Sequence, residues 1–363
     1  MCCNEFHAPS GVLSQLITTL PSTLSTAMPS IKVKSSTGKT EYNYTISTPS
    51  KDSAKTIDPK LPTVLFLHAV YLSSSIFHYQ FADPRLRRFN LVTLDLRLHG
   101  QTTGDFLPLT YNEHNAAEDI SKFMDALKLP ACHIVGCSMG SMIGAQFSIN
   151  YPKKVLSLFM MSPLGSTEPA DIAEGREEIT EYWMEGAKSN DEAALLDALY
   201  GARQFAFSNK TTTLITGLVN GTYPIVKKNW IPKNFDAYRT ATVDLIIQRK
   251  QHTREELSQI MVPVTIAHGM DDIPYPPNVT EEYFGRLQDA GVNVKMHKID
   301  GAPHFICVDV GKEINTVLHD FLMANISEPA PDVPTRHVLS PWDAQLRKDG
   351  WDPEEDDDHL CII

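Results

Sequence analysis

The stretch that most constrains the fold is residues 133–140, in which a serine stands between two glycines in the pattern Gly-x-Ser-x-Gly. An apolar run ends at Gly136, and a run compatible with a helix, Met139 to Ile149, follows Ser138. Small flanking residues permit a tight turn from strand to helix, in which the serine backbone is strained and its hydroxyl stands clear of the sheet. A glycine-rich turn that merely packs a helix close to a strand has the same pattern, so the rest of the chain has to decide between the two interpretations.

Charge and composition exclude several classes of function. The formal net charge of the 363 residues is −12, which argues against a nucleic-acid partner because no basic face is available to neutralise phosphates. Residues 326–363 hold ten acidic and three basic residues, a net charge of −7. The six cysteines match neither a metal site nor a disulfide framework, and we expect no metal and no organic cofactor.

The chain lacks the signals of a membrane or secreted protein. No apolar run approaches the length of a membrane span, and the first residues show no basic region followed by a long apolar stretch. We therefore expect a cytoplasmic protein without stable membrane insertion. The oligomeric state and the role of Cys2 and Cys3 are left open.

Strand-like and helix-like segments alternate through the first half of the chain. A hairpin is predicted within 31–47, and the segment 113–127 has the apolar spacing of a helix. The continuous apolar runs of strand length are 63–67, 91–96, the run that ends at Gly136, and 155–161. This alternation predicts a parallel sheet covered by helices on both faces, with ligands bound at the carboxyl ends of its strands.

The alternation stops after residue 164 and resumes near 262. Between these points lie helical stretches at 172–187, 191–202 and 240–249 and many aromatic residues, a minority of which we expect to line a pocket. The predicted domains are a flexible N-terminal arm at 1–30, an α/β core at 31–164 and 253–325, a helical cap at 165–252 and an acidic, disordered tail at 326–363. Trp342 and Trp351 are unusual in such a tail, yet deletion of 327–363 is expected to leave activity nearly intact.

Three residues that follow predicted strands supply the parts of a nucleophilic site. A serine hydroxyl needs a base to take its proton, histidine has a suitable pKa, and a carboxylate fixes the histidine tautomer. Ser138, Asp272 and His304 occur in the order associated with a serine turn on a parallel sheet. Asp271 competes with Asp272 for the role of the acid. The N–H groups of Val70 and Met139 are the candidate donors to the oxyanion.

These motifs resemble those of the α/β-hydrolase superfamily, in its branch with a helical cap. The residues that carry the resemblance are His68-Ala69, Asp95-Leu-Arg97-Leu-His99-Gly100, Gly136-x-Ser138-x-Gly140, Gly269-x-x-Asp272 and Gly301-Ala-Pro-His304-Phe305. The resemblance implies a mostly parallel sheet of about eight strands flanked by helices, with a helical cap inserted. It also implies that Asp272 rather than Asp271 is the acid. Ala69 and Leu98 stand where the family has glycine.

Other residues near the strand ends are expected to shape the site rather than to react. His68 is predicted to orient its loop by hydrogen bonds, and Asp95 and Arg97 are predicted to form a structural pair that braces the next loop. The alternatives are that His68 touches the substrate and that Asp95 and Arg97 take part in catalysis.

The resulting hypothesis is a serine hydrolase that cleaves an ester, thioester or lactone of a small apolar molecule through an acyl-enzyme, and so a carboxylic ester hydrolase. C–C bond hydrolysis or acyl transfer would use the same residues. A second hypothesis is a ligand-binding or sensor protein on a hydrolase scaffold, which the altered loop at Ala69 and the acidic tail motivate. Slow single turnover with tight product retention would favour that second hypothesis.

Overall fold

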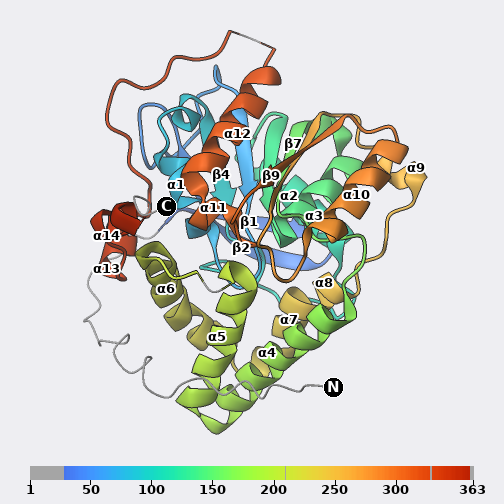
Figure 1. The fold of residues 1–363 in the computed structure, drawn as a ribbon, viewed down its shortest axis with the longest axis vertical. Coiled ribbons are helices and arrows are strands. Elements are labelled where there is room, and N and C mark those ends of the chain that lie inside the picture. The colour runs from blue at the N-terminus through green and yellow to red at the C-terminus, as the bar shows by residue number, and fades with distance from the viewer. Residues whose placement is uncertain (1–27, 209, 328, 360–363) are drawn as a thin grey trace.

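The computed structural model describes residues 28–208, 210–327 and 329–359. Its centre is a nine-stranded sheet with strand order β1-β2-β4-β3-β6-β7-β8-β9, and the short β5 pairs with β2 (Figure 1). The pairs formed by β2 are antiparallel, and every neighbouring pair from β4 to β9 is parallel. The sheet confirms the predicted α/β class. Most of the predicted N-terminal arm, with Cys2 and Cys3, lies outside the described residues.

The strands and helices have the following bounds. The strands are β1 Ser30–Ser35, β2 Gly38–Ser47, β3 Thr63–Leu67, β4 Asn90–Leu94, β5 Thr103–Gly104, β6 Cys132–Cys137, β7 Val155–Met161, β8 Val264–Gly269 and β9 Val294–Ile299. The helices are α1 His78–Ala82, α2 Glu113–Leu127, α3 Met139–Asn150, α4 Ala170–Ser189, α5 Glu192–Phe207, α6 Thr213–Asn229, α7 Phe235–Arg239, α8 Leu245–Ile247, α9 Arg254–Leu257, α10 Pro277–Asp289, α11 Ile306–Asp309, α12 Gly311–Ala324, α13 Asp343–Lys348 and α14 Pro353–His359.

The sheet separates two hydrophobic cores because successive side chains of a strand point to opposite faces. In β3, Leu65 and Leu67 pack into the core that holds apolar residues of α2, α3 and α10. Val64 and Phe66 pack into the core formed with α1, α11 and α12. All four side chains are fully buried, which is why this strand is apolar without interruption.

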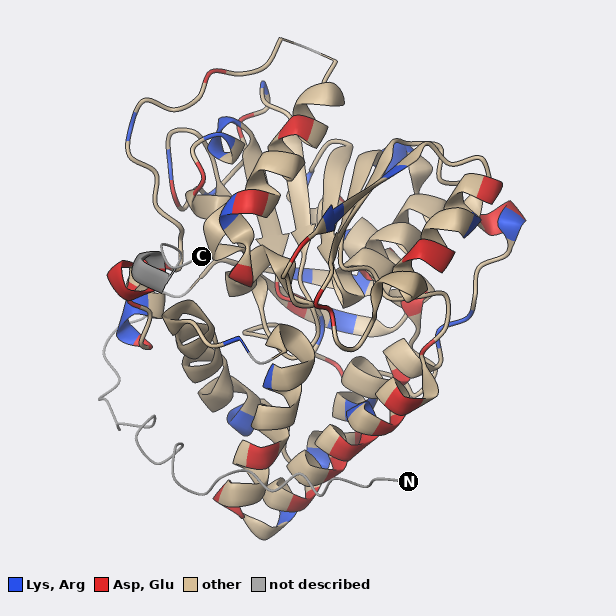
Figure 2. Ribbon diagram, viewed as in Figure 1, with Lys and Arg blue, Asp and Glu red and all other residues tan. Residues whose placement is uncertain are grey.

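Helices α4–α8, which we call the cap helices, lie between β7 and β8 in the sequence and gather at one end of the molecule (Figure 1). Helix α4 is amphipathic: Ile179 and Trp183 are buried, while most of its acidic residues are exposed. These acidic residues recur along the length of the helix (Figure 2). Helix α6 is not predicted from the sequence, because Gly217, Gly221 and Pro224 are residues that disfavour helices.

The prediction of a disordered C-terminal tail is wrong for the residues that the structure describes. Helices α13 and α14 form within it, and the side chains of Trp342, Leu346 and Trp351 are buried. Their apolar neighbours belong to the core on the α1 face and to α6. The acidic, proline-rich composition suggested disorder, but these three apolar side chains are buried in the folded protein.

Candidate active site

Ser138 lies at the turn between β6 and α3 with φ 53° and ψ −115°, a strained conformation for a residue with a side chain. The two glycines of the motif are required by close approach of the backbone. A Cβ on Gly136 would lie 2.4 Å from the carbonyl carbon of Gly140, and a Cβ on Gly140 would lie 2.0 Å from the carbonyl oxygen of Leu67. The motif is therefore a nucleophile-type turn packed directly against β3.

The structure brings together the three residues predicted for nucleophilic chemistry. The Ser138 hydroxyl donates to Nε2 of His304 over 2.8 Å, and Nδ1 of His304 donates to a carboxylate oxygen of Asp272 over 2.7 Å. All three side chains are buried. Asp272 and not Asp271 makes this contact, because Asp271 is exposed. The three residues follow β6, β8 and β9, whose parallel carboxyl ends meet at one edge of the sheet.

The N–H groups of Val70 and Met139 are available beside this turn. Met139 is the first residue of α3, and the first N–H groups of a helix have no partner within it. Across the described part of the chain, neither N–H donates to a protein acceptor, although both residues are almost fully buried. Two buried, unpaired donors are what an oxyanion requires.

His68 connects the loops that follow β3 and β4. Its Nδ1 donates to the Ala69 carbonyl over 2.7 Å, and its Nε2 accepts the Leu96 N–H over 2.8 Å. Burial lowers the pKa of His68 to about 4. The ring is therefore held as one neutral tautomer, and both nitrogens are used within the protein.

Asp95 and Arg97 do not form the predicted pair. Asp95 accepts the Ser74 N–H over 3.0 Å, the Ser74 hydroxyl over 2.7 Å and the Gln101 N–H over 2.9 Å. Arg97 instead faces Asp119, with 3.8 Å between the charged groups. Asp95 therefore braces the loop at Ser74 and its own loop at Gln101, whereas Arg97 is paired with Asp119 of α2.

Tyr275 is a residue of the site that sequence reasoning missed. Its N–H donates to the second carboxylate oxygen of Asp272 over 2.9 Å, and its ring lies against His304 with 5.0 Å between centroids. Its hydroxyl lies 2.8 Å from both carboxylate oxygens of Glu168 and accepts from Arg176 over 2.8 Å. Tyr275 therefore links the cap helix α4 to the carboxylate beside His304.

The charges around that hydroxyl are buried and paired. Glu168 contacts Arg176 over 2.7 Å and Arg249 over 2.6 Å, with all three side chains at most 4% exposed. Burial alone would raise the pKa of Glu168, but the two guanidinium groups hold it below its usual value. No sequence motif relates these residues, because they come from separate segments.

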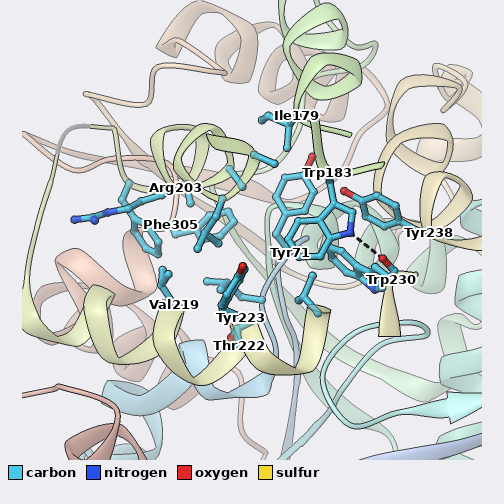
Figure 3. A pocket seen from close by; sticks show the side chains of 17 residues that line it. Tyr71, Ile179, Trp183, Arg203, Val219, Thr222, Tyr223, Trp230, Tyr238 and Phe305 are labelled. Carbon is cyan, nitrogen blue, oxygen red and sulfur yellow. Dashed lines mark hydrogen bonds between the residues drawn. The ribbon is translucent and has the colours of Figure 1, made fainter. Parts of the chain in front are cut away.

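An apolar pocket adjoins the site (Figure 3). It encloses about 550 Å³ of empty space, part of which is open to solvent. Its lining residues are Tyr71, Leu72, Ile179, Trp183, Ala198, Leu199, Ala202, Arg203, Ala206, Phe207, Val219, Thr222, Tyr223, Val226, Trp230, Tyr238 and Phe305. Ser138 is not among them, but Tyr71 follows Val70 and Phe305 follows His304. The pocket therefore begins one residue from the oxyanion loop and from the histidine.

Both indole N–H groups of the pocket lining donate to backbone carbonyls. The Trp183 indole donates to the Trp230 carbonyl over 2.9 Å (Figure 3). The Trp230 indole donates to the Leu98 carbonyl over 2.9 Å. The guanidinium of Arg203 points away from the aromatic side chains (Figure 3). The pocket therefore offers mostly apolar surface, and the Tyr71 hydroxyl is a buried polar atom of the lining without a hydrogen-bond partner among the described residues.

The described residues contain neither a metal-binding cluster nor a membrane-spanning helix. No group of three or more His, Cys, Asp or Glu side chains within 28–208, 210–327 and 329–359 is arranged to hold a metal ion. Among the helices of the same residues, none has the length and apolarity needed to cross a membrane.

Comparison with known proteins identifies the fold. Residues 62–309 match the family model described as alpha/beta hydrolase fold. The AB hydrolase superfamily protein YisY of Bacillus subtilis is 24% identical over 224 residues, which are 60% of this chain and 77% of that protein. The dihydrolipoyllysine-residue acetyltransferase component of the acetoin cleaving system of Cupriavidus necator is 35% identical over 105 residues, 28% of this chain. That match spans only 27% of the relative.

Solved structures show the same architecture at low sequence identity. The enol-lactonase from Burkholderia xenovorans LB400 superposes with a TM-score of 0.60 at 17% identity, covering 81% of this chain and all of the lactonase chain. A thermophilic esterase from Thermogutta terrifontis superposes with a TM-score of 0.61 at 14% identity, covering 82% of this chain and 98% of the esterase. At these identities the likeness concerns the fold alone.

Proposed function

The chain belongs to the α/β-hydrolase fold family, and we propose that it is a serine hydrolase that cleaves an ester, thioester or lactone of a small apolar molecule. One observation carries the proposal. His304 is hydrogen-bonded to both Ser138 and Asp272, over 2.8 Å and 2.7 Å, at the buried carboxyl edge of the sheet. The names of two structural neighbours, an esterase and an enol-lactonase, agree with this class of reaction.

The proposed reaction runs through an acyl-enzyme. The Ser138 oxygen attacks the carbonyl carbon while Nε2 of His304 takes its proton, and Asp272 stabilises the imidazolium that forms. The N–H groups of Val70 and Met139 bind the carbonyl oxygen as it becomes negative. His304 then gives its proton to the leaving alcohol, thiol or ring oxygen. A water molecule, deprotonated by His304, attacks the acyl carbon and releases the acid and Ser138.

The pocket supports an apolar group on the substrate. Its aromatic side chains present ring faces and edges, and their N–H groups are already paired with backbone carbonyls. A charged group placed there would lose its hydration and find no charged partner among these aromatic side chains. We therefore expect the pocket to take an uncharged acyl chain or ring next to the scissile carbonyl.

A second candidate is a ligand-binding protein with slow turnover, and one observation favours it. Ser138 is 0% exposed and does not line the pocket, so a ligand could occupy the pocket without reaching the hydroxyl. Ala69, in place of the family's glycine, is also fully buried beside the oxyanion loop.

Labelling with a fluorophosphonate probe tests the proposal. The parent protein should be labelled at a single serine, whereas Ser138→Ala and His304→Ala should not be labelled. Ser148→Ala is the matched control, because Ser148 is another buried serine of α3 whose hydroxyl donates to the Gly144 carbonyl. It should be labelled like the parent.

The aspartate is tested by a matched pair of variants. Asp272→Asn should reduce the rate of labelling and of p-nitrophenyl ester hydrolysis by about 10⁴-fold, because the histidine would lose the partner that fixes its tautomer. Asp271→Asn should react like the parent. A folded parent that is not labelled, or labelling that survives Ser138→Ala, would refute the proposal and favour the binding protein.

A further inference from the structure

Helix α6, Thr213–Asn229, is a poor helix by its own sequence. It contains Gly217, Gly221 and several β-branched residues, and Pro224 has no N–H to offer the preceding turn. Four of its side chains nevertheless line the apolar pocket: Val219, Thr222, Tyr223 and Val226. A pocket wall built on a weak helix needs support from outside the helix.

The C-terminal segment provides that support at the start of α6. The carboxylate of Asp356 accepts the N–H of Thr213 over 2.7 Å and the N–H of Leu214 over 3.1 Å. These N–H groups belong to the first turn, where the helix has no acceptors of its own and where a negative charge is favourable. The Thr213 side chain also exchanges hydrogen bonds with the backbone of Asp352, over 2.8 Å and 2.9 Å.

The same segment follows α6 for two further turns (Figure 1). Asn220 donates to the Asp349 carbonyl over 2.8 Å. A Cβ on Gly217 would lie 3.0 Å from the Leu346 carbonyl oxygen and 3.2 Å from Trp351. Gly217 weakens the helix, but because it has no side chain it also allows the C-terminal segment to approach the helix closely.

The other end of the segment is fixed to the α/β core. Arg336 contacts both carboxylate oxygens of Asp52, over 2.7 Å and 3.0 Å, and the buried Arg87 donates to the same carboxylate over 2.9 Å. Trp342 packs edge-on against Phe81 of α1, with 5.0 Å between ring centroids. The segment therefore spans from the core to the cap helices.

We propose that residues 336–356, which we call the strap, hold α6 in place and so determine which substrates the pocket accepts. Asp356 and Trp351 are then positioning residues for the pocket wall. The strap lies beyond residue 309, where the match to the family model ends, so it is a feature of this chain outside the shared domain. The specificity part of this inference rests on the proposed hydrolase function.

Asp356→Ala is the first test, with Glu355→Ala as the matched control because Glu355 is an exposed carboxylate of the same helix. The substrates are p-nitrophenyl octanoate and p-nitrophenyl acetate. Losing a helix-terminal carboxylate should lower the octanoate-to-acetate ratio of kcat/KM about fivefold, and Glu355→Ala should leave that ratio within about twofold of the parent. An unchanged ratio in folded Asp356→Ala would overturn the proposed role in specificity.

Hydrogen exchange tests the strap without relying on catalysis. The amides of the first two turns of α6 should exchange about fivefold faster in Asp356→Ala, and faster still in Trp351→Ala, but not in Glu355→Ala. If these amides exchange equally slowly in the parent and in all three variants, the proposal that the strap supports α6 is overturned. If the parent hydrolyses neither ester and is not labelled by fluorophosphonate, the proposed function fails, while the exchange result still decides whether the strap supports α6.

Discussion

Replacing Trp342 by alanine would show whether the C-terminal segment is part of the folded protein. The Trp342 side chain is 6% exposed, and it packs against Phe81, which is fully buried. Aromatic-to-alanine substitutions in cores lower the free energy of unfolding by about 3–5 kcal/mol, since both burial and packing are lost. The indole is nearly as buried as a core side chain, so we expect a loss of about 4 kcal/mol.

The assay is urea unfolding followed by circular dichroism at 222 nm. Leu339→Ala is the matched control, because Leu339 lies in the same segment but is 43% exposed. Its free energy of unfolding should stay within about 0.5 kcal/mol of the parent. If Trp342→Ala also changes the free energy by less than about 1 kcal/mol, the segment contributes no core packing and the reasoning is refuted.

Two further predictions concern the site and its loops. Tyr275→Phe keeps the N–H that donates to Asp272 but removes the hydroxyl that anchors the loop, so kcat for ester hydrolysis should fall about tenfold with KM unchanged. The control is Tyr283→Phe, which changes another buried tyrosine and should leave kcat unchanged. Equal kinetics for the two variants would contradict this prediction. Burial lowers the pKa of His68 to about 4 and that of His99 to about 3, so below pH 6.5 the unfolded chain binds protons that the folded protein does not. Stability present above pH 6.5 should therefore be lost as pH falls toward 4, at up to about 1.4 kcal/mol per pH unit for each histidine, and a flat profile of urea midpoints against pH would contradict it.

Much of the α/β core could be predicted because its signals are local. The apolar runs 63–67 and 155–161 coincide with β3 and β7, and the periodic segment 113–127 coincides with α2. The two glycines near Ser138 allow the turn in which its φ is positive, and each residue of the proposed triad lies within five residues of the end of a strand. Such features depend on backbone sterics and on the periodicity of apolar residues over short stretches, and both can be recognised in the sequence alone.

Other features depended on partners far away in the sequence. Asp271 and Asp272 are neighbours with the same chemistry, and only the packing of the loops after β8 and β9 buries one of them against His304. Tyr275 carries no motif, because its role comes from contacts with Glu168 and Arg176 in the cap helices.

The sequence by itself determined the α/β class, the turn at Ser138 and the small set of residues able to perform nucleophilic chemistry. The tertiary structure decided how the cap helices form an apolar pocket and that the acidic C-terminal segment is folded, and it places Asp272, the acid that the resemblance implied, against His304. The physical reason is the range of the interactions. Backbone conformation and strand periodicity depend on residues that are adjacent in the sequence. The docking of Trp342 on Phe81 and the contact of Asp356 with α6 instead join residues more than a hundred positions apart.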